Sequence, residues 1–251
     1  MRRYDTGHRP SRRVLTAVVG IVVVLIGVAI WLHGKPDPTG AGNGAAPGQS
    51  ASNTAEISRE VPADPPSDGV ALPEGTDQIA GYAAGFPASD LGAVSAQVAI
   101  ARAQVGFDYN QAAQVAGIYA APDTRAVLEE RSRAAVALRR DQAGVSADGK
   151  VPAPASYAVT PVAFTLEELD SGNYAVSLLS YVSLTDAEGT IGDFLYCGTQ
   201  VFGWIEGDWK VIQPSQADLE HLVATGPPPA VAPETPEYER AGWITIRGEY
   251  Q

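Results

Sequence analysis

The apolar run from Val14 to Leu32 limits the folds open to this chain, because it carries no charge over a length that matches a lipid bilayer. It reads VLTAVVGIVVVLIGVAIWL. At about 1.5 Å of rise per helical residue it covers a hydrocarbon core of roughly 30 Å. Within a bilayer every backbone amide needs a partner inside its own segment, so a spanning run is helical. We therefore predict a transmembrane helix over residues 14–32.

The residues that flank this run predict its orientation. Residues 1–13 contain repeated arginines and a single acid, Asp5, and basic segments of this kind are retained on the cytoplasmic side. We expect a cytoplasmic tail, a single-pass anchor in the cell membrane and an extracytoplasmic remainder. A cleaved secretory signal has the same order of basic and apolar segments and is the alternative. Trp31 and His33 stand where a cleavage site needs small residues, which favours the anchor.

The charge balance limits which partners the chain can bind, and the cysteine content limits how its fold can be stabilised. The chain has 29 acidic residues against 17 Lys and Arg, a formal net charge of −12. Such a surface repels nucleic acid, so we expect no nucleic-acid partner. The single cysteine, Cys197, cannot form an internal disulfide, so the domain must be held by packing alone. We expect Cys197 to be a small buried apolar residue rather than a reactive thiol.

Residues 33–80 are dominated by glycine, proline, alanine and serine. This composition buries too little apolar surface to offset the entropy of ordering, and we predict a disordered linker.

From residue 81 onward, apolar residues recur at spacings of three and four, which indicates helices. We predict a first helix from Ser89 or Asp90 to about residue 105, a second over 110–120 and a third over 124–142, capped by Asp123 or Thr124. We expect the apolar positions of the third helix to face the core: Val127, Leu128, Ala135 and Leu138. We expect the polar faces to lie in solvent, including Gln97, Arg131, Arg133, Arg139 and Arg140.

After residue 154 the period changes from 3.6 to 2, which indicates strands. We predict strands over 157–166, 173–185, 190–205 and 209–212, with Pro161 at an edge or a bulge and a tight turn at Glu206–Asp208. Consecutive strands with short turns pair antiparallel. The fold class is therefore α+β over residues 81–214, with three helices packed on a curved antiparallel sheet of about four strands.

The remaining residues, 215–251, form a proline-rich tail. Residues 216–224 are predicted to form a short helix, and the GPPPAVAPETP segment that follows is extended. Beyond it lies a short strand-like patch with Trp243, Ile244 and Ile246. The patch either folds back on its own domain or is donated as a strand to a partner.

Two features together carry a resemblance. Helices precede a meander of long strands, and the last hairpin reads FGWIEGDWKVI over residues 202–212. This order resembles the cone-shaped fold of nuclear transport factor 2-like proteins. With an N-terminal anchor and a linker, the layout is similar to inner-membrane assembly factors of type IV secretion and conjugation systems, including small anchored proteins of high-GC Gram-positive bacteria. The resemblance implies a scaffold and no catalytic residue.

Catalytic and metal-binding signatures are absent from the sequence. The domain has no histidine placed to pair with a nucleophile or to hold a metal, and it has no phosphate loop and no Cys-x-x-Cys. We expect no enzyme activity, no cofactor and no metal.

Alternate positions of the third predicted strand suggest a pocket. Phe194, Tyr196, Phe202 and Trp204 share one face and would line either a cavity for a small apolar ligand or a packed core. Asp193 lies on the other parity. If it pointed into the cone, it could act as a base, which is the weakest hypothesis.

These observations favour a non-catalytic, membrane-anchored scaffold of a conjugative-transfer or secretion-type complex, acting through protein contacts of its extracytoplasmic domain. A binding protein for a small apolar ligand is the alternative, and an enzyme using Asp193 is third. Self-association into a homo-oligomer is left open.

Overall fold

The computed structural model describes residues 57–66 and 68–248. The predicted cytoplasmic tail and transmembrane helix lie outside these residues. Within them, no helix combines the length and the apolar character needed to cross a bilayer.

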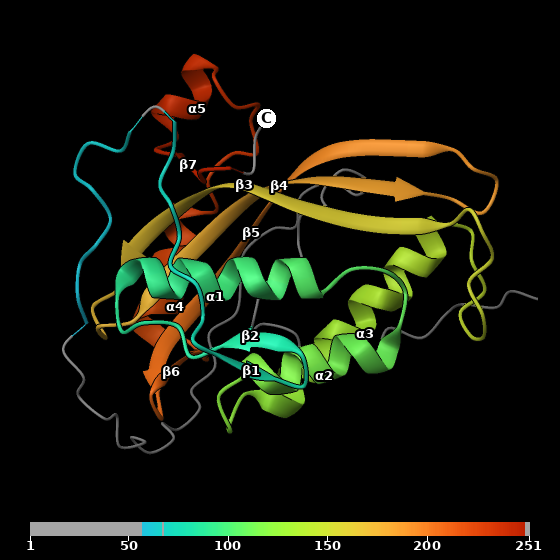
Figure 1. Cartoon of the computed structure of the whole chain (residues 1–251), viewed down its shortest axis with the longest axis horizontal. Coiled ribbons are helices and arrows are strands. Elements are labelled where there is room, and N and C mark those ends of the chain that lie inside the picture. Colours follow the sequence, from blue (N-terminus) through green and yellow to red (C-terminus); the bar gives the residue numbers. More distant parts are fainter. Residues whose placement is uncertain (1–56, 67, 249–251) are drawn as a thin grey trace, which may run out of the picture.

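The described part has an α+β fold built on a five-stranded antiparallel sheet (Figure 1). The strand order is β6-β5-β4-β3-β7, and a small separate hairpin pairs β1 with β2. The strands are β1 (Asp77–Ile79), β2 (Tyr82–Ala84), β3 (Ser156–Glu168), β4 (Tyr174–Thr185), β5 (Ile191–Ile205), β6 (Asp208–Val211) and β7 (Ile244–Thr245). The α+β class is confirmed. The strand number is not, because the tail adds β7 to the predicted four.

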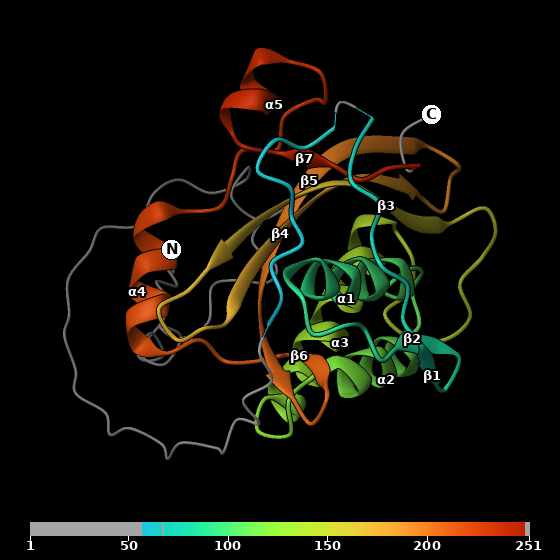
Figure 2. The ribbon, with the colours of Figure 1, turned by 60° about the vertical axis from the view of Figure 1, so that its left-hand side comes forward.

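Three helices lie on one face of the sheet (Figures 1 and 2): α1 (Asp90–Ala103), α2 (Tyr109–Tyr119) and α3 (Arg125–Gln142). Ser89 caps α1 as predicted, since its Oγ accepts a hydrogen bond from Gly92 N at 3.1 Å. Thr124 precedes α3 but does not cap it. Its hydroxyl donates instead to the carbonyl of Val211 in β6, at 2.9 Å. The start of α3 is thereby fastened to the edge of the sheet.

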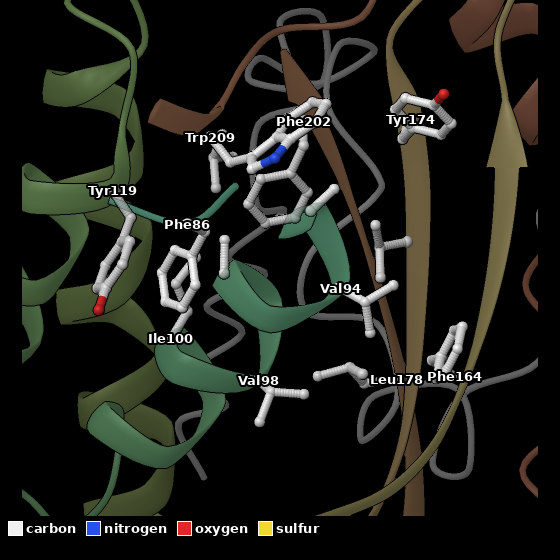
Figure 3. Packing of buried hydrophobic residues seen from close by; sticks show 14 of the residues in the cluster. Phe86, Val94, Val98, Ile100, Tyr119, Phe164, Tyr174, Leu178, Phe202 and Trp209 are labelled. Atoms are coloured by element: carbon white, nitrogen blue, oxygen red, sulfur yellow. The ribbon is translucent and has the colours of Figure 1, made fainter. Parts of the chain in front are cut away.

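The main core lies between α1 and the sheet. Figure 3 shows Val94 and Val98 of α1 facing Leu178 of β4 and Phe164 of β3, and all four are buried. The alternation in β4 was predicted and is confirmed, because Tyr174, Val176 and Leu178 face the helices, whereas Ala175 and Leu179 join clusters on the opposite face. Each face of the sheet therefore carries its own apolar set.

The hairpin turn and the bulge occur where the sequence predicts them. Glu206 and Gly207 link β5 to β6, and both have positive φ, at 52° and 83°. This is the geometry of a two-residue turn whose twist matches the strands. In β3 the register shifts between Pro161 and Ala163, so the proline stands at a bulge, where a strand tolerates a residue without an N–H donor.

The C-terminal tail covers the second face of the sheet. It contains α4 (Gln216–Thr225), α5 (Pro236–Arg240) and β7, which pairs with Ala163 and Phe164 of β3. Trp243 is buried against Leu179, and its indole N–H donates to Pro229 O at 3.0 Å. Of the two predictions for the tail, folding back on the domain is the one observed, and Trp243, Ile244 and Ile246 all pack on it.

The predicted linker ends earlier than expected. Residues 57–80 were assigned to it on composition, but they pack on the domain, while residues 33–56 lie outside the described part. Val70 is buried, forms a parallel bridge with Ile246 and donates its N–H to Thr245 O at 2.8 Å. A few anchored residues are enough to order a segment that is rich in proline and glycine, so the average composition was misleading.

A buried carboxylate holds the first part of this segment. Asp90 is the first residue of α1, and its Oδ1 accepts hydrogen bonds from Glu60 N at 2.7 Å and Val61 N at 3.3 Å. Its backbone N–H donates to Ser58 O at 3.0 Å. The negative charge also lies at the positive end of the helix dipole. One side chain therefore joins the entering chain to the helix on which the core is built.

Replacing Asp90 should release this segment. We expect Asp90→Ala to lower the free energy of unfolding by about 2–4 kcal/mol, because the N–H groups of Glu60 and Val61 lose their buried acceptor. Asp90→Asn keeps one acceptor oxygen and should cost less. Chemical denaturation measures the change, and hydrogen exchange should show faster exchange at residues 60–61. Asp64→Ala is the control, since Asp64 is exposed in the same segment. Equal stability of the Asp90→Ala and Asp64→Ala variants would contradict the assigned role.

Candidate functional site

A cavity of about 120 Å³ lies between the helices and the sheet. Its walls come from α1, α2 and α3 on one side and from β3, β4 and β5 on the other. α1 packs directly on β3 and β4, whereas α3 packs mainly on α2, so the sheet is left incompletely covered below α3. Leu138, Gln142 and Phe194 line the cavity and are exposed, which places its mouth between the end of α3 and β5.

Most of the cavity wall is apolar. Ile100 and Leu178, both shown in Figure 3, contribute from the edge of the core, and Leu128, Ala135 and Val159 contribute from α3 and β3. A cavity of about 150 Å³ with an apolar lining accepts benzene. The cavity in this protein is somewhat smaller than that, but it opens to solvent beside Leu138 and Phe194, so a compact molecule with a single ring can extend through its mouth.

Two buried glutamines line the cavity, and the side-chain oxygen of each has no hydrogen-bond partner among the described residues. Gln97 of α1 is 6% exposed and Gln200 of β5 is 5% exposed. Among the described residues neither Oε1 atom has a partner. A buried amide without a partner costs free energy, and nearly all buried polar groups in proteins are paired. Both of these glutamines line the same cavity.

Two arginines of α3 also line the cavity. The guanidinium carbon of Arg139 lies 4.2 Å from the ring centroid of Tyr157, and its Nη1 donates to Gln104 O at 3.0 Å. Burial lowers the pKa of Arg139, and its contacts with Tyr157 oppose that shift. Arg131 makes no hydrogen bond or ion pair with the described residues, and partial burial lowers its pKa too. Both cations are partly removed from water, and neither has a carboxylate partner among residues 57–66 and 68–248.

Tyr196 closes part of the wall from the sheet. Its ring lies over Gly198, where a Cβ atom would come within 2.9 Å of the ring carbon Cε1. Glycine at this position therefore lets the aromatic ring lie flat along the strand. Burial raises the pKa of the Tyr196 hydroxyl to about 12, so it stays protonated at neutral pH and can donate a hydrogen bond.

The predicted pocket residues divide into two groups. Phe194 and Tyr196 line the cavity. Phe202 is fully buried in the main core, and Trp204 packs against that core with its ring 5.3 Å from that of Trp209. The four side chains therefore lie on one face of β5, as strand parity predicted. Phe194 and Tyr196 border the cavity, whereas Phe202 and Trp204 belong to the packed core.

Asp193 does not line the cavity. It is exposed, and it shares strand parity with Leu195 and Cys197, which pack on the opposite face near Trp243. The hypothesis of an inward-facing base is therefore wrong. Cys197 is a partly buried thiol whose pKa is raised by burial to about 12, in agreement with its prediction as an apolar residue rather than a nucleophile.

The sequence analysis predicted that several side chains lie in solvent, but the structure places them at the cavity or in the interior. Arg131, Arg139 and Gln97 line the cavity, and Arg140 is buried, with its guanidinium donating to the carbonyls of Phe107, Ser146 and Gly149. Conversely, Val127 and Leu138 are largely exposed although they were predicted in the core. One sequence pattern indicates the polar residues that line the cavity. Gln97 and Gln104 stand seven residues apart on one helix, and Gln200 shares strand parity with Phe194 and Tyr196.

Removing an unpaired amide should stabilise the fold. We expect Gln97→Leu to raise the free energy of unfolding by about 1–3 kcal/mol, because a buried group without a hydrogen bond is replaced by an apolar one of similar size. Thermal and denaturant unfolding measure this. Gln114→Leu is the matched control, since Gln114 is exposed on α2 and glutamine and leucine have similar helix propensities. A loss of stability in the Gln97 variant would mean that this amide supports the packing.

Comparison of the chain with protein-family models, with curated proteins and with solved structures gave no significant match.

Proposed function

We propose that this domain is a binding protein that holds a small, largely apolar molecule in the cavity between α3 and the sheet. The observation that carries the proposal is the pair of buried glutamines, Gln97 and Gln200, whose Oε1 atoms have no partner among the described residues and which stand in a mainly apolar wall. Ligand sites commonly combine an apolar lining with a few convergent polar groups that orient the ligand. A core that served stability alone would gain from apolar residues at both positions.

The geometry of the mouth supports the same proposal. Leu138 and Phe194 are apolar and more than a third exposed, at 41% and 38%, although both border the cavity. A ligand seated behind them would remove part of this apolar surface from water, which favours binding by about 25 cal/mol for each Å² buried. The rest of the cavity is preformed, so little ordering entropy opposes binding.

Filling the cavity should abolish binding. We expect benzamide to raise the unfolding temperature of the full chain, and Ala135→Leu to remove this shift because Ala135 lines the cavity. Ala134→Leu is the matched control on the solvent side of the same helix and should keep the shift. Differential scanning fluorimetry in one constant detergent buffer measures all three proteins. An equal shift in both variants, or no shift in the unmodified chain, would count against the cavity as a binding site.

A second candidate function is a membrane-anchored scaffold of a secretion-type or conjugative complex, acting through protein contacts. The edge of the sheet favours it. β6 pairs only with Phe202–Ile205, so β5 from Ile191 to Gln200 has no strand partner on its outer side within the described residues. Ile191 at the start of this edge is 65% exposed. An open edge with apolar side chains is suited to strand addition by a partner.

A lysine on this edge should separate the two functions. We expect Ile191→Lys to abolish crosslinks between the full-length protein and its partners in the native membrane, because charge on an open edge blocks strand pairing. Val223→Lys is the matched control, since Val223 on α4 is 63% exposed. Crosslinking with mass spectrometry identifies the partners. Membrane-embedded transport or ATPase subunits would support the scaffold, and crosslinks to the same chain alone would indicate a homo-oligomer. Crosslinks that survive in the Ile191 variant would exclude this edge.

A further inference from the structure

We infer that the ligand of the cavity is a small organic carboxylate, with a compact apolar body of about the size of a benzene ring and one anionic group held by Arg131 and Arg139. This inference rests on the binding function proposed above and adds the charge of the ligand to it. The carboxylate would meet the arginines, and the ring would fill the apolar part of the wall.

The charges around the cavity carry the first step. The chain as a whole has 29 acidic residues and a formal net charge of −12. Within the described chain no aspartate or glutamate lines the cavity, whereas two arginines do. In a protein with more acids than bases, a site with cations alone has the opposite sign to its surroundings. It therefore attracts an anion and disfavours an ammonium group or a metal cation.

The state of the two arginines carries the second step. Arg131 has no hydrogen bond or ion pair with any described residue. Arg139 stacks on Tyr157 and donates to a backbone carbonyl, yet no carboxylate within the described residues lies in ion-pair range of it. A guanidinium that is partly removed from water favours an anionic partner, and its planar fork fits a carboxylate with two parallel hydrogen bonds. The ligand would supply the missing counter-ion.

The side-chain amides of Gln97 and Gln200 carry the third step. Gln97 and Gln200 are both more than nine-tenths buried and have no partner for Oε1. A glutamine side chain presents two N–H donors as well as an acceptor, and it can turn either toward a ligand. Turned so that Nε2 faces the cavity, each amide donates to an anion and leaves its Oε1 directed away from it. In that orientation both amides add neutral donors to the two guanidinium groups, which is the arrangement that an anion requires.

Size and polarity of the wall limit the body of the ligand. A cavity of about 120 Å³ leaves room for a single ring and little more. Inorganic anions and acetate would leave the apolar surface of Ile100, Leu128 and Leu178 in contact with water. An apolar ring on the carboxylate removes that contact, so both parts of the molecule are needed for binding.

Benzoate and benzamide, which share one shape and differ in charge, test this inference on the full chain. At pH 7 benzoate is ionised, and we expect it to bind about tenfold or more tightly than benzamide. In Arg131→Gln this preference should fall below about threefold, because one of the two cations is gone. Arg133→Gln is the matched control, since Arg133 is on the same helix, does not line the cavity and should leave the preference unchanged. Ligand-observed NMR titration in one detergent buffer gives all dissociation constants.

Further measurements make each outcome decisive. Arg139→Gln is a second variant, and circular dichroism checks its fold because Arg139 also contacts Tyr157 and Gln104. Acetate is the probe without an apolar body and should bind at least about tenfold more weakly than benzoate. If benzamide binds and benzoate gains nothing, or the gain persists in both arginine variants, the anionic ligand is refuted while the binding function stands. If acetate binds as tightly as benzoate, the inferred apolar body is wrong. If no probe binds and Ala135→Leu changes nothing, both proposals fail.

Discussion

The close approach of α1 to Trp209 sets the geometry on which the rest of the domain depends. The indole N–H of Trp209 donates to Pro87 O at 2.8 Å, just before the helix begins. A Cβ atom on Gly92 would come within 2.0 Å of that same carbonyl oxygen, so only glycine allows the contact. Tyr174 packs edge-on against the indole, with the ring centroids 5.7 Å apart. The N-terminal end of α1 is thereby held tightly against β4 and β6, and the looser packing occurs at its other end, where the cavity lies.

Each face of the sheet carries a packed apolar layer, and this accounts for a domain that folds without a disulfide. The three long helices cover one face and the C-terminal tail covers the other. The two coverings meet at Val70 and Ile246, which bridge the entering chain to the tail. The tail thus pairs with β3 along one edge of the sheet, and the entering chain pairs with the tail at that same edge. This arrangement explains why a tail of low apolar content is ordered, because Trp243 and Ile246 are both buried in apolar clusters that include residues of the sheet.

Local sequence patterns predicted most of the fold. The predictions were wrong where contacts between residues far apart in the sequence determine the structure. The alternation in β4, the Ser89 cap and the turn at Glu206 each depend on neighbours within a few residues, so the sequence was sufficient. The order of residues 57–80 depends on Asp90 and Ile246, which no local window contains. For the site, strand parity found Phe194 and Tyr196. It could not locate Arg131 and Arg139, because helical periodicity assigns charged residues to solvent and cannot show that this face of α3 borders an enclosed space.

The polar residues at the cavity are hard to explain by stability. A domain with no disulfide depends on packing, yet its incompletely filled space is bordered by two amides with an unpaired Oε1 and by two arginines that find no carboxylate in the part of the chain that the structure describes. Each of these features opposes folding, because buried polar groups lose their hydration without a replacement. A ligand that carries an anion and an apolar ring would pair the guanidinium groups and fill the volume, and the two amides would turn their N–H donors toward it. The bound domain would then be more stable than the free one, which links occupancy of the cavity to the stability of the fold.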